Sequence, residues 1–199
     1  MLEVASEQRV VLSPCSWETY ERILAEHVDR SSPRFTYAEG ALEIMSPSLE
    51  HEKLNEATKI LVNLTCEELD IEVQALGSTT LRRPHLQRGV EPDSSFYFRV
   101  TDRDPGVDPP DLVVEIEISR SALDKLPILA DLGVPEVWRI GIQGVTILRL
   151  TGGKYKEATH SSFLPLDAAG LSHQLAQRQH LKHSLWLRGV RVWLRDLRS

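Results

Sequence analysis

The alternation of apolar and polar residues is clearest between residues 110 and 118, where the sequence reads Pro-Asp-Leu-Val-Val-Glu-Ile-Glu-Ile. Side chains of a β-strand point alternately to its two faces. One face of this segment is aliphatic and carries Leu112, Val114, Ile116 and Ile118. The opposite face carries the acids Asp111, Glu115 and Glu117. Because residues 112–114 are apolar at consecutive positions, we expect a central strand covered on both faces, with its acids in a cleft at the strand end.

Segments with helical or strand periodicity extend on either side of this strand. Helices are expected at 17–28, with Ser16 as the N-cap, at 49–69, with Ser48 as the N-cap, at 124–132, ending at Gly133, and at the C-terminus. Strands are expected at 34–38, 41–45, 71–76, 79–82, 93–98, 111–118, 136–140, 145–150 and 154–158. The turn-forming loop 100–110 is expected to be exposed beside the acidic strand. This order predicts an α/β fold with a mixed sheet flanked by helices, in a single domain over residues 1–199.

The spacing of the acids on the expected strand indicates a metal site. Glu115 and Glu117 would lie about 7 Å apart at their Cα atoms on the same face. Two like charges at this separation lower stability unless a cation or a protonation change relieves them, which is the chemistry of a divalent-metal site. The alternative is an edge strand with a solvated acidic face. The apolar run at 112–114 favours the metal site.

Further acids lie in two other segments. Asp93 follows Pro92, and proline is tolerated at the start of a strand, so Asp93 should lie near a strand end. Glu50 and Glu52 fall in the first turn of the helix expected at 49–69. The alternative for this pair is that both acids only complement the helix dipole.

Lys125 is the candidate cation near the acidic strand. Pro127 would break a helix interior, so the helix should begin near Asp124 and place Pro127 in its first turn. Lys125 then lies at a helix N-terminus, where the dipole disfavours a positive charge and a carboxylate or phosphate partner is expected. The alternative is an exposed surface lysine.

Taken together, these segments resemble the PD-(D/E)XK nuclease superfamily and, within it, the Uma-type family of putative restriction endonucleases. The resemblance spans roughly residues 16–150. The matching segments, in order, are Met45-Ser-Pro-Ser-Leu-Glu-His-Glu52, Glu91-Pro-Asp93, Pro110-Asp-Leu-Val-Val-Glu-Ile-Glu117, Lys125 and Gly133-Val-Pro-Glu-Val-Trp138.

The resemblance implies a restriction-endonuclease-like fold and assigns catalytic roles. Asp93 corresponds to the motif aspartate, Glu115 to the second acid, and Glu50 or its neighbour Glu52 to an additional helix glutamate. The superfamily pattern has a lysine two residues after the second acid, where this chain has Glu117. By resemblance to the family, Lys125 on the following helix replaces that lysine. Glu117 would then be a further ligand or a partner of the lysine.

The activity implied is that of a metal-dependent endonuclease acting on DNA. Asp93 and Glu115 would bind Mg²⁺ or Mn²⁺, with Glu50 bound through water or at a second metal ion. Such oxygen ligands favour these ions over zinc. Two alternatives remain open: an inactive or weakly active module that binds DNA or protein, and a metal-dependent hydrolase of another phosphoester.

Composition places the protein in a reducing, aqueous compartment. The 199 residues are 41% hydrophobic and include two cysteines, Cys15 and Cys66, which cannot form a disulfide framework. No apolar run approaches the ~20 residues of a membrane span, and no signal peptide opens the chain. We therefore expect a soluble cytoplasmic protein with no membrane partner.

The charge distribution bears on DNA binding. The net charge is −6, whereas DNA-binding proteins usually present a basic patch. Basic residues nevertheless prevail in the segment 172–199. The expected C-terminal helix has a basic face of Arg188, Arg191, Arg195 and Arg198 and an apolar stripe of Trp186, Val190, Trp193, Leu194 and Leu197. This helix could dock on the core, pair two subunits into a homodimer, or face DNA.

Overall fold

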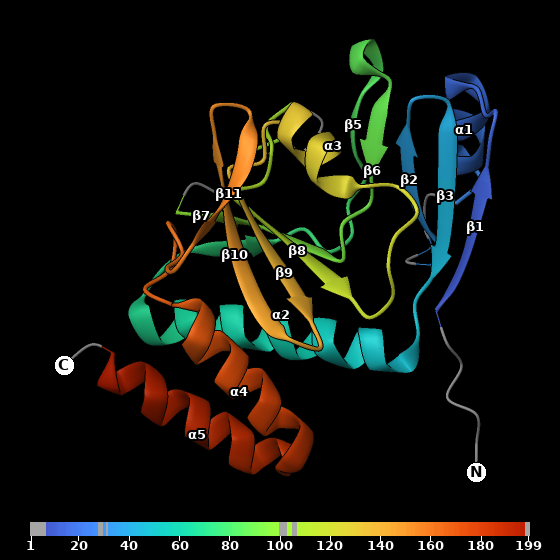
Figure 1. Ribbon diagram of the computed structural model, residues 1–199. Coiled ribbons are helices and arrows are strands. Elements are labelled where there is room, and N and C mark those ends of the chain that lie inside the picture. The colour runs from blue at the N-terminus through green and yellow to red at the C-terminus, as the bar shows by residue number, and fades with distance from the viewer. Residues whose placement is uncertain (1–6, 28–29, 31, 100–102, 105–106, 198–199) are drawn as a thin grey trace, which may run out of the picture.

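The structure of the protein is a computed structural model, which describes residues 7–27, 30, 32–99, 103–104 and 107–197. Its strands form two sheets, with helices packed on their faces (Figure 1). The first sheet has five strands in the order β1-β3-β2-β6-β5, and the second has six in the order β11-β10-β9-β8-β7-β4. The sequence predicted one mixed sheet, so the predicted fold class is confirmed but the number of sheets is not.

The first sheet comes from the N-terminal half of the chain. Its strands are β1 (Gln8–Leu12), β2 (Arg34–Ala38), β3 (Ala41–Ser46), β5 (Leu81–Arg83) and β6 (Arg88–Val90), and a short 3-10 turn covers Pro84–Leu86. Helix α1 (Trp17–Ala25) packs beside it, capped by Ser16 as predicted (Figure 1). The β2–β3 hairpin turns at Glu39 and Gly40, both with positive φ, which glycine adopts readily.

The second sheet is mixed, and the acidic strand lies inside it. Its strands are β4 (Val73–Ala75), β7 (Ser94–Phe98), β8 (Leu112–Glu117), β9 (Glu136–Gly141), β10 (Gly144–Thr151) and β11 (Lys154–Ala158). Strand β8 pairs antiparallel with β7 and parallel with β9. Leu112 and Val114 pack into one core cluster and Val113 into another, which confirms a central strand covered on both faces.

Helices occupy both faces of this second sheet. Helix α2 (Leu49–Leu69) runs along one face, with α4 (Ala168–His180) and α5 (His183–Asp196) on the same side. Helix α3 (Lys125–Asp131) packs on the opposite face, toward the first sheet. Within the described part of the chain, no helix is long and apolar enough to cross a membrane.

Several elements differ from the sequence prediction. Strand β1 was not predicted because it is a mostly exposed edge strand without buried alternation, and β6 has only three residues. The first helix ends at Ala25 rather than at residue 28, which lies outside the described residues. The C-terminal region forms two helices instead of one. Residues 100–102 and 105–106 of the loop predicted to be exposed also lie outside the described residues.

The apolar stripe of α5 is part of the protein's own core. Trp186, Val190 and Leu194 are fully buried in the cluster that includes α2. On the adjoining face, Arg191 and Arg195 pair with Glu68 of α2 at 2.7 and 3.2 Å. The stripe therefore no longer argues for a homodimer, and these two arginines are already neutralised within the chain. Arg198, the fourth arginine of the predicted basic face, lies outside the described residues.

Candidate active site

Strands β7 and β8 bring two buried carboxylates together. Ser94 pairs with Val114 across the two antiparallel strands, and one step further along this pairing places Asp93 beside Glu115. The backbone N–H of Ile116 donates to Asp93 Oδ2 at 2.6 Å. Asp93 and Glu115 are 2% and 4% exposed, so both carboxylates are largely removed from water. The two acids predicted as metal ligands are therefore neighbours in the fold.

The first turn of α3 supplies a cation to this pair. Asp124 caps the helix by accepting from the Leu126 N–H, and Pro127 lies in the first turn as predicted. Lys125 Nζ donates to Glu115 Oε2 at 2.6 Å, and the lysine side chain is 13% exposed. The helix thus brings an ammonium group to a strand ten residues earlier in the sequence.

Burial and neighbouring charges set the protonation of this group. Burial raises the pKa of Glu115 to about 7, with Lys125 opposing the increase and Asp93 adding to it. Burial also disfavours charge on Lys125, but Glu115 and Asp93 raise its pKa above the usual range. For Asp93 the effect of burial is outweighed by a hydrogen bond from His51 and by the charges of Lys125 and Arg34, which lower its pKa. Asp93 is therefore anionic and Lys125 cationic at neutral pH.

Two residues that the sequence analysis did not assign complete the surroundings of Asp93. Arg34, the first residue of β2, binds Asp93 Oδ1 and also Glu52 Oε1, the latter at 2.9 Å. His51 is fully buried in α2, with its Nε2 3.3 Å from Asp93 Oδ2. The available signals were an arginine opening an otherwise uncharged strand and a histidine within the segment that resembles the family.

The two candidate helix glutamates have different surroundings. Glu52 joins the group through Arg34. Glu50 is not brought to it: its carboxylate lies 3.9 Å from Lys53 Nζ and lines a different cavity with Leu54 and Leu175. The structure therefore gives no support to Glu50 as a ligand of the metal at Asp93 and Glu115.

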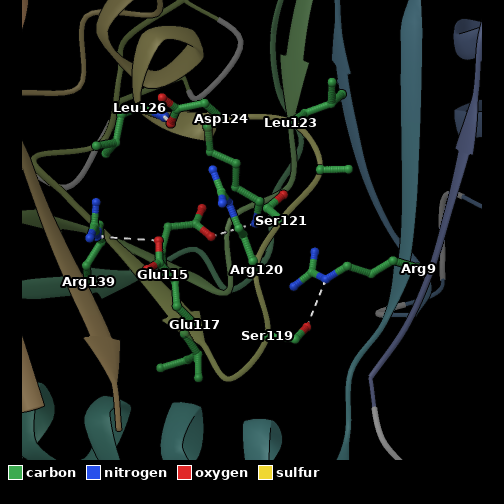
Figure 2. Close-up of a pocket in the computed structure, with 13 residues that line it drawn as sticks. Arg9, Glu115, Glu117, Ser119, Arg120, Ser121, Leu123, Asp124, Leu126 and Arg139 are labelled. Atoms are coloured by element: carbon green, nitrogen blue, oxygen red, sulfur yellow. Dashed lines mark hydrogen bonds and ion pairs between the residues drawn. The ribbon is translucent and has the colours of Figure 1, made fainter. Parts of the chain in front are cut away.

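A cavity of about 440 Å³ opens beside Glu115 and Lys125. Its walls are the end of β8, the loop that leads to α3, and single side chains from β1 and β9 (Figure 2). Glu117 lines this cavity, half exposed, with its Oε1 3.4 Å from Arg139 Nε. Glu115, Glu117 and Lys125 therefore share one cavity.

Glu43 of β3 fixes the loop between β8 and α3. Its buried carboxylate accepts hydrogen bonds from the N–H groups of Ala122 and Leu123, at 2.6 and 2.9 Å, and from the Ser121 hydroxyl. Arg9 of β1 binds the same carboxylate. The first sheet therefore holds the segment that delivers Lys125 to the second sheet.

The site offers a carboxylate oxygen, which is the kind of ligand that Mg²⁺ prefers. Within the described ranges, no cluster of three or more His, Cys, Asp or Glu side chains is arranged to hold a metal ion. Mg²⁺ does not need such a cluster, since one or two carboxylates with several waters and substrate phosphates usually bind it. The Oε1 atom of Glu115 is buried without a hydrogen-bond partner, as expected for an oxygen that a cation would contact. Glu115 therefore offers an open oxygen, whereas both oxygens of Asp93 are already in contact with protein groups.

Comparison with solved structures finds a protein of similar fold. The crystal structure of a putative nuclease belonging to DUF820 from Anabaena variabilis superposes with a TM-score of 0.54 at 16% sequence identity, covering 91% of this chain and 99% of that one. At this identity the similarity concerns the fold. No curated protein matches the chain.

The sequence model of the Uma2 family, described as "Putative restriction endonuclease", matches residues 17–178. The match takes in α1 through most of α4 and every residue of the carboxylate and lysine group. Because it covers well over half of the 199 residues, this protein belongs to the Uma2 family of putative restriction endonucleases.

Proposed function

We propose that this protein is a divalent-metal-dependent endonuclease that hydrolyses phosphodiester bonds of DNA. The observation that carries the proposal is the direct contact of Lys125 with Glu115, beside Asp93. Two neighbouring acids and one ammonium group, with Glu115 and Lys125 at the wall of a cavity, are the elements that phosphodiester hydrolysis requires. Membership of the Uma2 family supports the same activity.

In this mechanism Asp93 and Glu115 would hold Mg²⁺ or Mn²⁺, which when bound supplies an activated water and neutralises charge on the phosphoryl group. Arg34 and His51 keep Asp93 ionised and fixed in position. The Lys125 ammonium has three N–H donors, of which one binds Glu115. The remaining donors can bind a phosphoryl oxygen, whose negative charge grows in the transition state.

A second candidate function is a DNA-binding or protein-interaction module without catalytic activity. The observation that favours it is the set of partners around Asp93: Arg34 binds Oδ1, while the Ile116 N–H and His51 contact Oδ2. The aspartate is therefore neutralised by a protein cation. If Arg34 does not give way, this carboxylate is not available to a metal ion.

Nicking of supercoiled plasmid DNA distinguishes these functions. Wild-type protein should nick DNA with Mg²⁺ or Mn²⁺ and not with EDTA. Glu115→Gln and Lys125→Ala should each lower the rate by about a hundredfold or more. Glu56→Gln, an exposed acid on α2 that pairs with Lys59, is the matched control and should retain the wild-type rate. If the wild-type protein did not nick DNA with any divalent metal, the proposed nuclease activity would be excluded.

Calorimetric titration with Mn²⁺ assigns the roles of the residues separately. Asp93→Asn should remove most of the binding heat, because it removes one of two anionic ligands. Lys125→Ala should bind Mn²⁺ about as well as wild type, since an ammonium group does not coordinate a cation. Equal heats for wild type and Asp93→Asn would contradict the proposed metal ligands.

A further inference from the structure

We propose that Arg139 and Arg120 bind a backbone phosphate of DNA next to the carboxylates. The choice of DNA as the ligand rests on the proposed function. Neither arginine was singled out by the sequence pattern or by the resemblance to the nuclease superfamily. Both line the cavity of about 440 Å³ that also contains Glu115 and Lys125 (Figure 2).

Strand pairing places Arg139 beside Glu115. In the parallel pair β8–β9, Glu115 and Arg139 are direct partners, so both side chains leave the same face of the sheet. Asp93 lies next to Glu115 on the other side, at the start of β7. The sheet therefore presents a row of three groups, Asp93, Glu115 and Arg139, across three neighbouring strands. Glu115 and Arg139 line the same cavity, so a phosphodiester that reaches Glu115 comes within reach of the arginine.

Arg139 is only weakly engaged by the protein. Its one ion pair is to Glu117, at 3.4 Å from Nε, and this nitrogen is buried without a hydrogen-bond partner within the described residues. The side chain is 39% exposed. A guanidinium carries five N–H donors in a planar fork that matches the oxygens of a phosphate. Arg139 thus lines the cavity with a partly exposed guanidinium that a single ion pair holds within the described residues.

Arg120 is the second available cation. It is exposed on the loop between β8 and α3, and no ion pair joins it to any described residue. The other two basic residues of the cavity are committed: Arg9 pairs with Glu7 and Glu43, and Lys125 pairs with Glu115. Within the described chain, the cavity's available positive charge thus comes from Arg120, which has no ion pair, and from Arg139, which is held only by the 3.4 Å pair with Glu117.

Glu117 controls how freely Arg139 can reach a ligand. It occupies the position where the superfamily pattern has lysine, and it holds the arginine through the ion pair described above. Replacing it by glutamine should release Arg139 and tighten DNA binding. If the effect acts through Arg139, it should disappear when the arginine is also replaced, whereas simple repulsion between Glu117 and phosphate would persist.

Fluorescence anisotropy with a short labelled DNA duplex tests the proposal without requiring cleavage. Binding is measured in Ca²⁺ and in EDTA over a series of salt concentrations, and the DNA is checked for integrity afterwards. Arg139→Gln and Arg120→Gln should each weaken binding about tenfold. Each should also make the plot of the logarithm of the binding constant against the logarithm of the salt concentration less steep by about one, since each removes one contact with phosphate.

Matched variants show whether the effect is local. Arg22→Gln, on an exposed position of α1, makes the same charge change outside the cavity and should bind like wild type. Arg139→Lys should retain the salt slope but bind more weakly than wild type, because lysine lacks the planar fork. Glu117→Gln should bind more tightly than wild type, and Glu117→Gln combined with Arg139→Gln should match Arg139→Gln alone.

The outcomes separate this proposal from the proposed function. Wild-type slopes and affinities in both arginine variants would overturn the phosphate site, even if plasmid nicking is intact. Wild-type protein that binds no duplex would overturn it as well. Arginine-dependent binding by a wild-type protein that never nicks DNA would support the phosphate site and exclude the nuclease.

Discussion

At the scale of single residues, the site depends on how one buried cation and one buried anion neutralise each other. Arg34 and Asp93 are almost completely removed from water, and each is the other's closest partner of opposite charge. Removing one partner of such a pair is more costly than removing both, because the remaining charge is left without compensation. We therefore expect the folded site to depend strongly on Arg34.

Arg34→Ala should lower the free energy of unfolding by roughly 3–5 kcal/mol, since it leaves the Asp93 carboxylate buried without its closest cation. A divalent cation can take the place of the arginine and stabilises the folded state that binds it. Mg²⁺ should therefore recover more stability in this variant than in wild type. Urea unfolding with and without Mg²⁺ measures both effects.

Arg82→Ala is the control for that experiment. Arg82 forms an exposed ion pair with Glu21, and such pairs contribute little. If Arg34→Ala were as stable as Arg82→Ala, the Arg34–Asp93 contact would not be important for folding. If Mg²⁺ had no additional effect on Arg34→Ala, Asp93 would not be the metal ligand that the arginine covers.

At the scale of elements, two glutamates that link segments distant in the sequence have opposite pKa shifts. Burial raises the pKa of Glu43, but the hydrogen bonds from Leu123 N–H, Ser121 and Arg9 lower it more, so the net pKa lies below 4.5. For Glu91, burial raises the pKa above 4.5 and is only partly offset by hydrogen bonds from Thr80 and Phe35. The two glutamates should therefore have opposite effects on stability as pH changes.

Glu43 contributes stability that is complete above its unfolded pKa of 4.5 and is lost as pH falls through its lower folded pKa. Glu91 contributes stability that is complete below 4.5 and is lost as pH rises through its higher folded pKa. Glu43→Gln should thus flatten the acid side of the stability profile. In the wild type, the Glu91 contribution to the free energy of unfolding decreases as the pH rises above 4.5. Glu91→Gln should abolish this decrease. Urea unfolding over a pH series measures both effects. If the two substitutions changed the pH dependence of the free energy of unfolding in the same direction, the opposite pKa shifts of Glu43 and Glu91 would be refuted.

Local elements were predictable where one residue pattern dominates. The hairpin and the helix from Leu49 to Leu69 match their predicted positions closely, because caps, turns and periodicity all agree within each segment. The positions of Arg34 and His51 at Asp93 could not be predicted in this way. They depend on how one sheet packs beside the other, and nothing in the local pattern of β2 or α2 encodes that contact.

At the scale of the whole molecule, the C-terminal helices complete the core and do not form a separate surface. Trp186 is fully buried, and its ring N–H donates to the Gln174 carbonyl of α4 at 2.8 Å. From the sequence alone, burial in the chain and burial between subunits gave the same amphipathic pattern. The distinction required the position of α2, whose apolar face receives α5.

Trp186→Ala should lower the free energy of unfolding by about 3–5 kcal/mol, because it leaves a large cavity in a closed core. The molecular mass in light scattering should not change. Leu185→Ala, at an exposed position of the same helix, is the control and should change stability by no more than about 0.5 kcal/mol. A fall in mass together with unchanged stability would show that the tryptophan lies between subunits.

The parallel pairing of β8 and β9 has a consequence for how such sites are recognised in other sequences. A chain that leaves one strand and enters its parallel neighbour must cross back over the sheet, and α3 lies in this crossover. The helix therefore begins at the carboxyl edge of β8, where Glu115 and Glu117 end the strand. A lysine in its first turn therefore lies beside the strand-end acids, and Lys125 contacts Glu115. Sequence searches that require a fixed acid-to-lysine spacing would overlook this chain, whereas a search for an ammonium group near paired strand-end acids would find it.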